Sequence, residues 1–278
     1  MVSKHLVLPN ITFMSDLVTL LTLPAIGLAI GIIVGLTGVG GGSLMTPILL
    51  GGLGIPPAIA VGTDLLFAAI TKSFGGVAHW RAGHVAPRLL KLLIASSVAG
   101  AILAFAVVRA LAPDVAELNR VIRFSLGVAL FITAAALLVR PWLLRWRNGN
   151  RRASSAVSDI VGSPYATLAL GALIGALVTI SSVGAGAIGV TALLLLHPAL
   201  PIARVVGTDI AYAVPLTALA GAAHASVGHV DWSLLAGLLV GSVPGILLGA
   251  HLSKRVPEFA TRSILVALLS VAGVKLVG

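Results

Sequence analysis

Long apolar runs separated by short polar stretches dominate this chain. A helix that crosses a bilayer needs about 20 predominantly apolar residues. Runs near this length lie at 17–36, 57–78, 89–109, 119–140, 164–181, 203–224, 232–250 and 262–277. Two shorter runs, at 43–54 and 185–196, are too short for a comfortable crossing. The pattern predicts ten hydrophobic helical segments, five in each half, with one short segment per half.

The two halves also share a sequence motif. Residues 61–85 match residues 206–230 at 11 of 25 positions without a gap, at a shift of 145. The Gly-rich stretch 37–42 matches 181–186 at a shift of 144. Gly, Thr, Asp and His add little to apolar burial in lipid, so their presence in both copies indicates one site built from two halves.

Composition identifies the class of protein. Hydrophobic residues make up 58% and charged residues 9%, with a mean hydropathy of +1.12. A soluble domain has about 25% charged residues. We therefore expect an all-α integral protein that crosses the inner (plasma) membrane several times. The absence of Cys excludes disulfides and thiolate chemistry, and no metal or other cofactor is expected.

The charge pattern predicts topology rather than nucleic-acid binding. The net charge is +10, but five of the 18 Lys and Arg residues lie between Arg140 and Arg152, as in a cytoplasmic loop. We expect a tail at 1–16 without a cleavable signal, a first repeat at 17–140, a basic cytoplasmic linker at 141–160 and a second repeat at 161–278. If all segments cross, 12 Lys and Arg lie inside and 5 outside, against 10 and 7 if the short segments re-enter. The charges thus favour inverted repeats.

The Gly-rich motifs are the expected substrate site. Four glycines in five residues disfavour a continuous helix by about 1 kcal/mol each, so each motif predicts a broken helix whose free N–H groups can bind an anion. Close helix packing through glycine is the alternative; the two copies, each followed by a short segment, favour the break. The expected substrate-binding residues are Thr37, Gly38, Val39, Gly40, Gly41, Gly42 and Ser43, with Ser181, Ser182, Val183, Gly184, Ala185 and Gly186.

Charged residues near or within the spans are candidates for coupling and gating. Thr63-Asp64 and Thr208-Asp209 open two apolar runs, where each pair either caps a helix or serves as a coupling site or gate. Lys72 has no counterpart in the second half and either binds the anion or extends towards the interface.

Two histidine pairs follow at the span ends. His79 and His84 correspond to His224 and His229. A five-residue spacing does not place both rings on one helix face, so a zinc site is not expected. An interfacial role and a pH-sensitive gate both remain open.

These residues resemble the TauE/SafE family, the sulfite-exporter group of membrane permeases. The resemblance rests on GLTGVGGGSLMTPIL, VGTDL and the Gly-His-Val turn, with their repetition, and covers about residues 20–275. It implies transport of small sulfur-containing anions such as sulfite, sulfoacetate or other sulfonates, with export as the expected direction. Ser182, Ala185 and Ala187 replace Gly38, Gly41 and Ser43 in the second copy, so the pocket is expected to be asymmetric.

We therefore predict a transporter, not an enzyme, whose repeats rock about a midplane anion site. Its partners are the anion and the lipid bilayer; coupling to protons or to sodium, the anion and the oligomeric state stay open. An anion-selective channel is the nearer alternative. An intramembrane hydrolase with a serine nucleophile from either motif is the more distant one.

Overall fold

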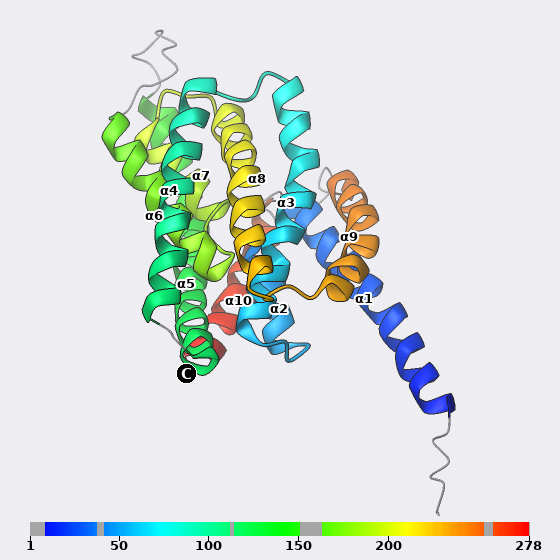
Figure 1. Ribbon diagram of the computed structural model, residues 1–278. Coiled ribbons are helices and arrows are strands. Elements are labelled where there is room, and N and C mark those ends of the chain that lie inside the picture. The colour runs from blue at the N-terminus through cyan, green and yellow to red at the C-terminus, as the bar shows by residue number, and fades with distance from the viewer. Residues whose placement is uncertain (1–8, 38–41, 112–113, 151–162, 253–257, 278) are drawn as a thin grey trace, which may run out of the picture.

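The computed structural model describes residues 9–37, 42–111, 114–150, 163–252 and 258–277, and every regular element in them is an α-helix (Figure 1). This confirms the all-α prediction. The helices are α1 (Pro9–Thr37), α2 (Gly42–Gly51), α3 (Pro57–Arg81), α4 (Pro87–Leu111), α5 (Val115–Asn150), α6 (Pro164–Ser181), α7 (Ala187–Leu196), α8 (Ile202–Ser226), α9 (Trp232–Leu252) and α10 (Glu258–Val277).

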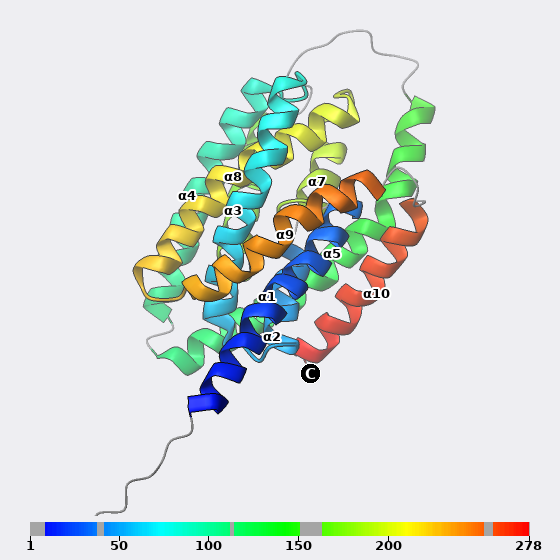
Figure 2. The ribbon, with the colours of Figure 1, turned by 90° about the vertical axis from the view of Figure 1, so that its right-hand side faces the viewer.

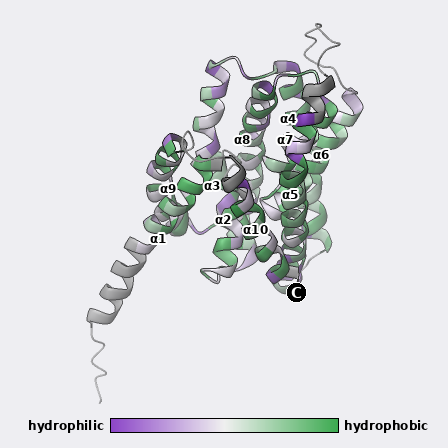
Figure 3. Ribbon diagram, turned by 180° about the vertical axis from the view of Figure 1, so that it is seen from behind, coloured by the Kyte–Doolittle hydropathy of each residue, from purple (hydrophilic) through white to green (hydrophobic). Residues whose placement is uncertain are grey.

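The outer surface of the bundle suits lipid. Six helices in the described part are long and apolar enough to cross a membrane: α3, α4, α5, α6, α8 and α9. Large apolar side chains point outward from them, including Leu103 (66% exposed) on α4 and Leu247 (69% exposed) on α9. Figure 3 shows the hydrophobic colour extending over the outer helices. The chain is thus a multi-pass membrane protein.

Two helices are too short to span. α2 and α7 have 10 residues each, which gives about 15 Å at 1.5 Å per residue, half of a hydrocarbon core of about 30 Å. α7 packs against α5 and α8, and α2 packs against α3. The two short segments expected from the hydropathy pattern are therefore helices inside the bundle.

α3 and α8 lie antiparallel in the middle of the bundle (Figure 1). Gly62, near the start of α3, lies against His224 near the end of α8, whereas Gly76 lies against Ala211 near the start of α8. The two copies of the VGTD motif thus lie near the starts of two neighbouring helices that run in opposite directions.

Two further helix pairs pack through glycine. α1 runs beside α9, as Figure 2 shows, and α4 runs beside α6. A Cβ on Gly31 of α1 would overlap the backbone of Ser242, and a Cβ on Gly175 of α6 would overlap the backbone of Ser97. Glycine permits this approach of two helices in lipid. In both pairs, a helix of one half packs on a helix of the other half.

Two helix boundaries differ from the expected domain limits. α1 begins at Pro9, inside the predicted tail, and α5 continues to Asn150, inside the predicted linker. Pro141 lies within α5 without ending it, although an interior proline removes one helical hydrogen bond and crowds the preceding turn. Hydropathy detects the apolar part of a helix and not its polar extension. Residues 151–160 of the expected linker lie outside the described residues.

Candidate functional site

The second Gly-rich motif interrupts a helix, as predicted. α6 ends at Ser181, Ser182 has a φ of 58°, Gly184 and Gly186 have φ values of 137° and 125°, and α7 then begins. A positive φ is accessible to glycine at little cost. The Ser181 hydroxyl accepts a hydrogen bond from the Val183 N–H at 3.2 Å and so holds the interrupted backbone.

The first Gly-rich motif lies where one helix ends and another begins. α1 ends at Thr37 and α2 begins at Gly42. Gly38, Val39, Gly40 and Gly41 lie outside the described residues. The side chains of Thr37 and Ser43 also lie outside them. The substrate-binding role of residues 37–43 therefore stays a prediction.

Asp64 and Asp209 are buried inside their helices and do not cap them. Asp64 is 0% exposed and Asp209 is 1% exposed. Each lies seven residues past the start of its helix, about 10 Å along the axis. Pro56 and Pro201 occupy the N-cap positions and make no side-chain cap hydrogen bond. Neither aspartate therefore caps the helix that carries it.

Each carboxylate faces a short helix. Thr46 of α2 donates its hydroxyl hydrogen to Asp64 Oδ2. Asp209 Oδ1 lies directly against Gly189 in the first turn of α7, where a Cβ would overlap it, and the Gly186 backbone amide is also a neighbour. The N-terminus of a helix attracts negative charge. The anion nearest the α7 N-terminus is thus a carboxylate of the protein.

Lys72 joins the second break to both carboxylates. Its ammonium group donates to the Ala185 carbonyl at 3.3 Å, and Asp209 and Asp64 are its charged neighbours. Only 9% of the residue is exposed. Lys72 therefore points into the protein, and the alternative in which it extends to the interface is wrong.

These groups form a central polar cluster of five residues: Asp64, Lys72, Ser182, Asp209 and Tyr212. The Ser182 hydroxyl neighbours Asp64 and the Tyr212 hydroxyl neighbours Asp209. Neither hydroxyl has a partner with hydrogen-bond geometry among the described residues, and the same holds for Oδ1 of both aspartates. Buried polar atoms without partners are uncommon, so the cluster has free capacity for a ligand or water.

Sequence reasoning missed three residues around this cluster. Tyr212 reads as an ordinary buried aromatic, although it follows Asp209 by three positions and so shares its helix face. Thr46 belongs to a short apolar helix and carries no signal by itself. Arg140 was counted with the arginines of the cytoplasmic loop, but it belongs to α5, where it is a charged neighbour of Asp209.

Thr63 and Thr208 bind the opposite half of the chain and lie outside the cluster. Thr63 Oγ1 accepts the backbone N–H of Asp231 at 3.0 Å. Thr208 Oγ1 accepts the backbone N–H of Ala86 at 2.9 Å. Both donors directly precede a helix, α9 or α4, where backbone N–H groups have no helical acceptor. The threonines thus cap helices of the other half.

The histidine pairs meet at turns and also lie outside the cluster. The His79 and His84 ring centroids are 5.6 Å apart, and those of His224 and His229 are 5.7 Å apart. Gly83 and Gly228, with φ values of 69° and 78°, reverse the chain between the members of each pair. The spacing argument assumed a continuous helix and so missed that the turn brings the rings together.

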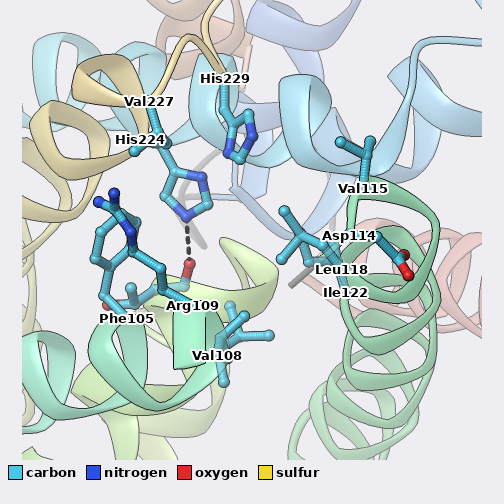
Figure 4. Close-up of a pocket in the computed structure, with 12 residues that line it drawn as sticks. Phe105, Val108, Arg109, Asp114, Val115, Leu118, Ile122, His224, Val227 and His229 are labelled. Carbon is cyan, nitrogen blue, oxygen red and sulfur yellow. Dashed lines mark hydrogen bonds between the residues drawn. The ribbon is translucent and has the colours of Figure 1, made fainter. Parts of the chain in front are cut away.

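His224 also contacts the helix that leads to the second break. Its Nε2 lies 3.0 Å from the Thr179 carbonyl, drawn as the dashed line in Figure 4. A carbonyl only accepts, so Nε2 carries the hydrogen. Within the described part of the chain, no hydrogen bond joins Ser181 or Ser182 to a histidine. No described group of three or more His, Cys, Asp or Glu residues could hold a metal ion.

Comparison with known proteins agrees with this architecture. Residues 23–276 match the family model described as "Sulfite exporter TauE/SafE". The chain is 38% identical over 251 residues to "Probable membrane transporter protein YjnA" of Bacillus subtilis (strain 168), covering 90% of this chain and 97% of the relative. It is 25% identical over 247 residues to "Probable membrane transporter protein YdhB" of the same organism, covering 89% and 96%. No solved structure matches.

Proposed function

Because the chain belongs to the sulfite exporter TauE/SafE family of membrane transporters, we propose that it carries a small sulfur-containing anion, such as sulfite, sulfoacetate or another sulfonate, through the central polar cluster. The observation that carries this proposal is Lys72. A buried lysine beside an interrupted helix is the positive charge that an anion needs in a medium of low dielectric constant.

Three further groups suit an oxyanion there. The hydroxyls of Ser182 and Tyr212 lie beside the carboxylates of Asp64 and Asp209, and each can donate to an anion instead. The Gly186 backbone N–H, directly before α7, already neighbours the Asp209 carboxylate, so the start of α7 adjoins the same space. The anion would lie between these donors and Lys72, and it would displace the Asp209 carboxylate from the N-terminus of α7.

We also propose that the protein consists of two inverted repeats of five segments each, at 17–140 and 161–278. The antiparallel pair α3 and α8 supports this, because the two helices carry the same motif and run in opposite directions. The pairs α1–α9 and α4–α6, in which a helix of one half packs on a helix of the other half, support it as well. Rocking of these repeats about the cluster would give alternating access, with export from the inner side of the plasma membrane as the working direction.

The charges in the cluster favour a proton as the coupling ion. With every group ionised, the two carboxylates and one ammonium of the central polar cluster sum to −1, and the Arg140 guanidinium is a further cation near Asp209 only. A further negative charge at 4 Å from a carboxylate is repelled by about 4 kcal/mol at an effective dielectric constant of 20. A proton on one carboxylate removes that repulsion, so proton and anion would occupy the site together. The proton gradient and the anion gradient would then set the direction of transport.

Transport into liposomes tests the proposal. Purified protein would be reconstituted and the uptake of sulfite, sulfoacetate, taurine, sulfate and acetate measured. We expect saturable uptake and counterflow of a sulfur anion, which distinguish a carrier from a channel. Lys72→Met should lower this flux more than tenfold, because the variant loses the buried charge at similar size.

Lys91→Met is the matched control, since Lys91 is exposed on α4. Both variants should elute from size exclusion as the wild type does. Wild-type flux in a folded Lys72→Met variant would refute the role of the cluster. Transport of acetate alone, or of no anion in the panel, would refute the substrate class.

A further inference from the structure

A cavity of about 250 Å³ lies between the ends of α4 and α8, the start of α5 and the last turns of α6. A cavity of about 15 Å³ is enough to hold one water. A small oxyanion with part of its hydration shell therefore fits in this cavity. Figure 4 shows Arg109 and both histidines around this space, with Leu118 and Ile122 of α5 opposite. None of these residues belongs to the central polar cluster.

The charged and titratable side chains that line the cavity are Arg109, Asp114, His224 and His229. Asp114 is exposed, and its carboxylate accepts the Glu117 backbone N–H at 2.7 Å, which fixes it at the start of α5. The α6 lining residues, Thr179 and Ile180, carry no charge. The cavity therefore has one permanent cation, two imidazoles and a carboxylate already bound by a helix start.

The imidazoles provide the unused polar atoms. His224 is 4% exposed, its Nε2–H donates to the Thr179 carbonyl, and its Nδ1 has no partner among the described residues. The Nδ1 atom of His229 is likewise buried without a described partner. A neutral imidazole carries one N–H donor, and that of His224 is taken by the Thr179 carbonyl, so Arg109 supplies the charge of the site and His229 a polar ring beside it.

The position of the cavity links it to transport. Thr179 and Ile180 directly precede Ser181 and Ser182, so the cavity adjoins the second helix break from one end of the bundle. That end is where α5 begins, whereas the Arg-rich stretch starts within the other end of α5. An anion that leaves the central polar cluster towards this end meets the cavity next.

We infer that the cavity is an access site for the transported oxyanion on the side opposite the Arg-rich linker, where Arg109 and the His224–His229 pair hold the anion before release or after entry. The inference rests on the proposed function for the identity of the anion. The site itself would bind an oxyanion whether or not transport follows, and this permits separate tests.

Chemical protection tests occupancy without transport. Diethyl pyrocarbonate modifies accessible neutral imidazoles, and the modification of His229 can be followed by peptide mass spectrometry at pH 7. We expect sulfate and sulfoacetate to slow this modification at least threefold relative to chloride at equal ionic strength. Arg109→Gln should abolish the protection. Arg120→Gln, which removes an exposed arginine of α5 outside the cavity, should preserve it.

Transport kinetics test the role in access. In liposomes with one orientation of the protein, Arg109→Gln and His224→Gln should each raise the half-saturating sulfite concentration on the cavity side about tenfold and leave the maximal rate unchanged. Glutamine retains an N–H donor for the Thr179 carbonyl, and Arg109→Gln serves alone if His224→Gln does not fold.

The outcomes separate the two proposals. Absent protection together with unchanged half-saturation would overturn the access site, and so would an equal effect of Arg120→Gln, which would indicate surface charge only. Protection of His229 in a wild type that transports no sulfur anion would support the anion site and refute the proposed function.

Discussion

Gly62 of α3 lies against the backbone carbonyl of His229, so close that a Cβ would overlap the oxygen. Gly207 of α8 has the same relationship to the carbonyl of His84. The glycine of each VGTD motif thus packs directly against the Gly-His-Val turn of the other half. This contact explains why the two motifs recur together, since each half supplies the partner that the other needs.

Substitution of Gly62 by alanine should therefore destabilise the protein. The overlap forces the α3 start and the turn apart, at a cost of about 1–3 kcal/mol for an overpacked contact. The measurement is thermal unfolding in detergent. Gly75→Ala is the control in the same helix, because its Cβ would lie 3.6 Å from Ile210, an ordinary contact. A Gly62→Ala melting temperature equal to that of Gly75→Ala would contradict the contact.

Thr208→Val should also destabilise the protein, because Thr208 binds the start of α4 in the other half. Valine keeps the shape but leaves the Ala86 N–H without its acceptor, which costs about 1–3 kcal/mol for a buried donor. Thr208→Ser retains the hydroxyl and should melt close to the wild type. Thr63→Val removes the corresponding bond to Asp231. The two effects should add, and a strongly non-additive double variant would show that the two contacts are not independent.

Hydropathy was sufficient to predict the helices but not their mutual contacts. Ten apolar runs correspond to the ten helices in the described residues, because a lipid-exposed span must be apolar along its length. The burial of Lys72 against the Ala185 carbonyl could not be predicted, since it depends on how α3 packs on the second break. The cap from Thr63 to Asp231, 168 residues away, is of the same kind.

Asp209→Asn should uncouple proton movement from anion transport. The substitution removes one charge of the central polar cluster and keeps its size, so an anion can bind without a proton on that side chain. In liposomes containing a pH-sensitive dye, sulfoacetate should drive a proton flux through the wild type. The flux per anion should fall at least several-fold in Asp209→Asn.

Asp231→Asn is the matched control for this experiment. Asp231 accepts the Leu234 backbone N–H at 2.9 Å at the start of α9, and asparagine caps a helix about as well as aspartate. Its proton flux should equal that of the wild type. Unaltered coupling in Asp209→Asn would exclude this carboxylate as the proton carrier.

His197 should make the stability of the protein depend on pH. It lies between α7 and α8, is 0% exposed, and its Nε2 lies 3.0 Å from Thr167 Oγ1. The Thr167 hydroxyl hydrogen is directed to the Ser163 carbonyl at 3.2 Å, so His197 donates from Nε2 and its buried Nδ1 stays unprotonated. Burial lowers the pKa of His197 below its ordinary value.

The sign of the effect follows from that shift. At acid pH the unfolded chain binds a proton at His197 that the folded protein disfavours, so stability falls as the pH drops below about 6.5, the ordinary pKa of histidine. Above that pH both states are neutral at this residue and its contribution is constant. Melting temperatures between pH 5 and 8 should therefore decline more steeply on the acid side in the wild type than in His197→Gln, which keeps a donor for Thr167. His251→Gln, at an exposed position on α9, should leave the wild-type slope unchanged. Equal slopes in all three proteins would show that the folded and unfolded states bind a proton at His197 equally well, which would contradict the prediction.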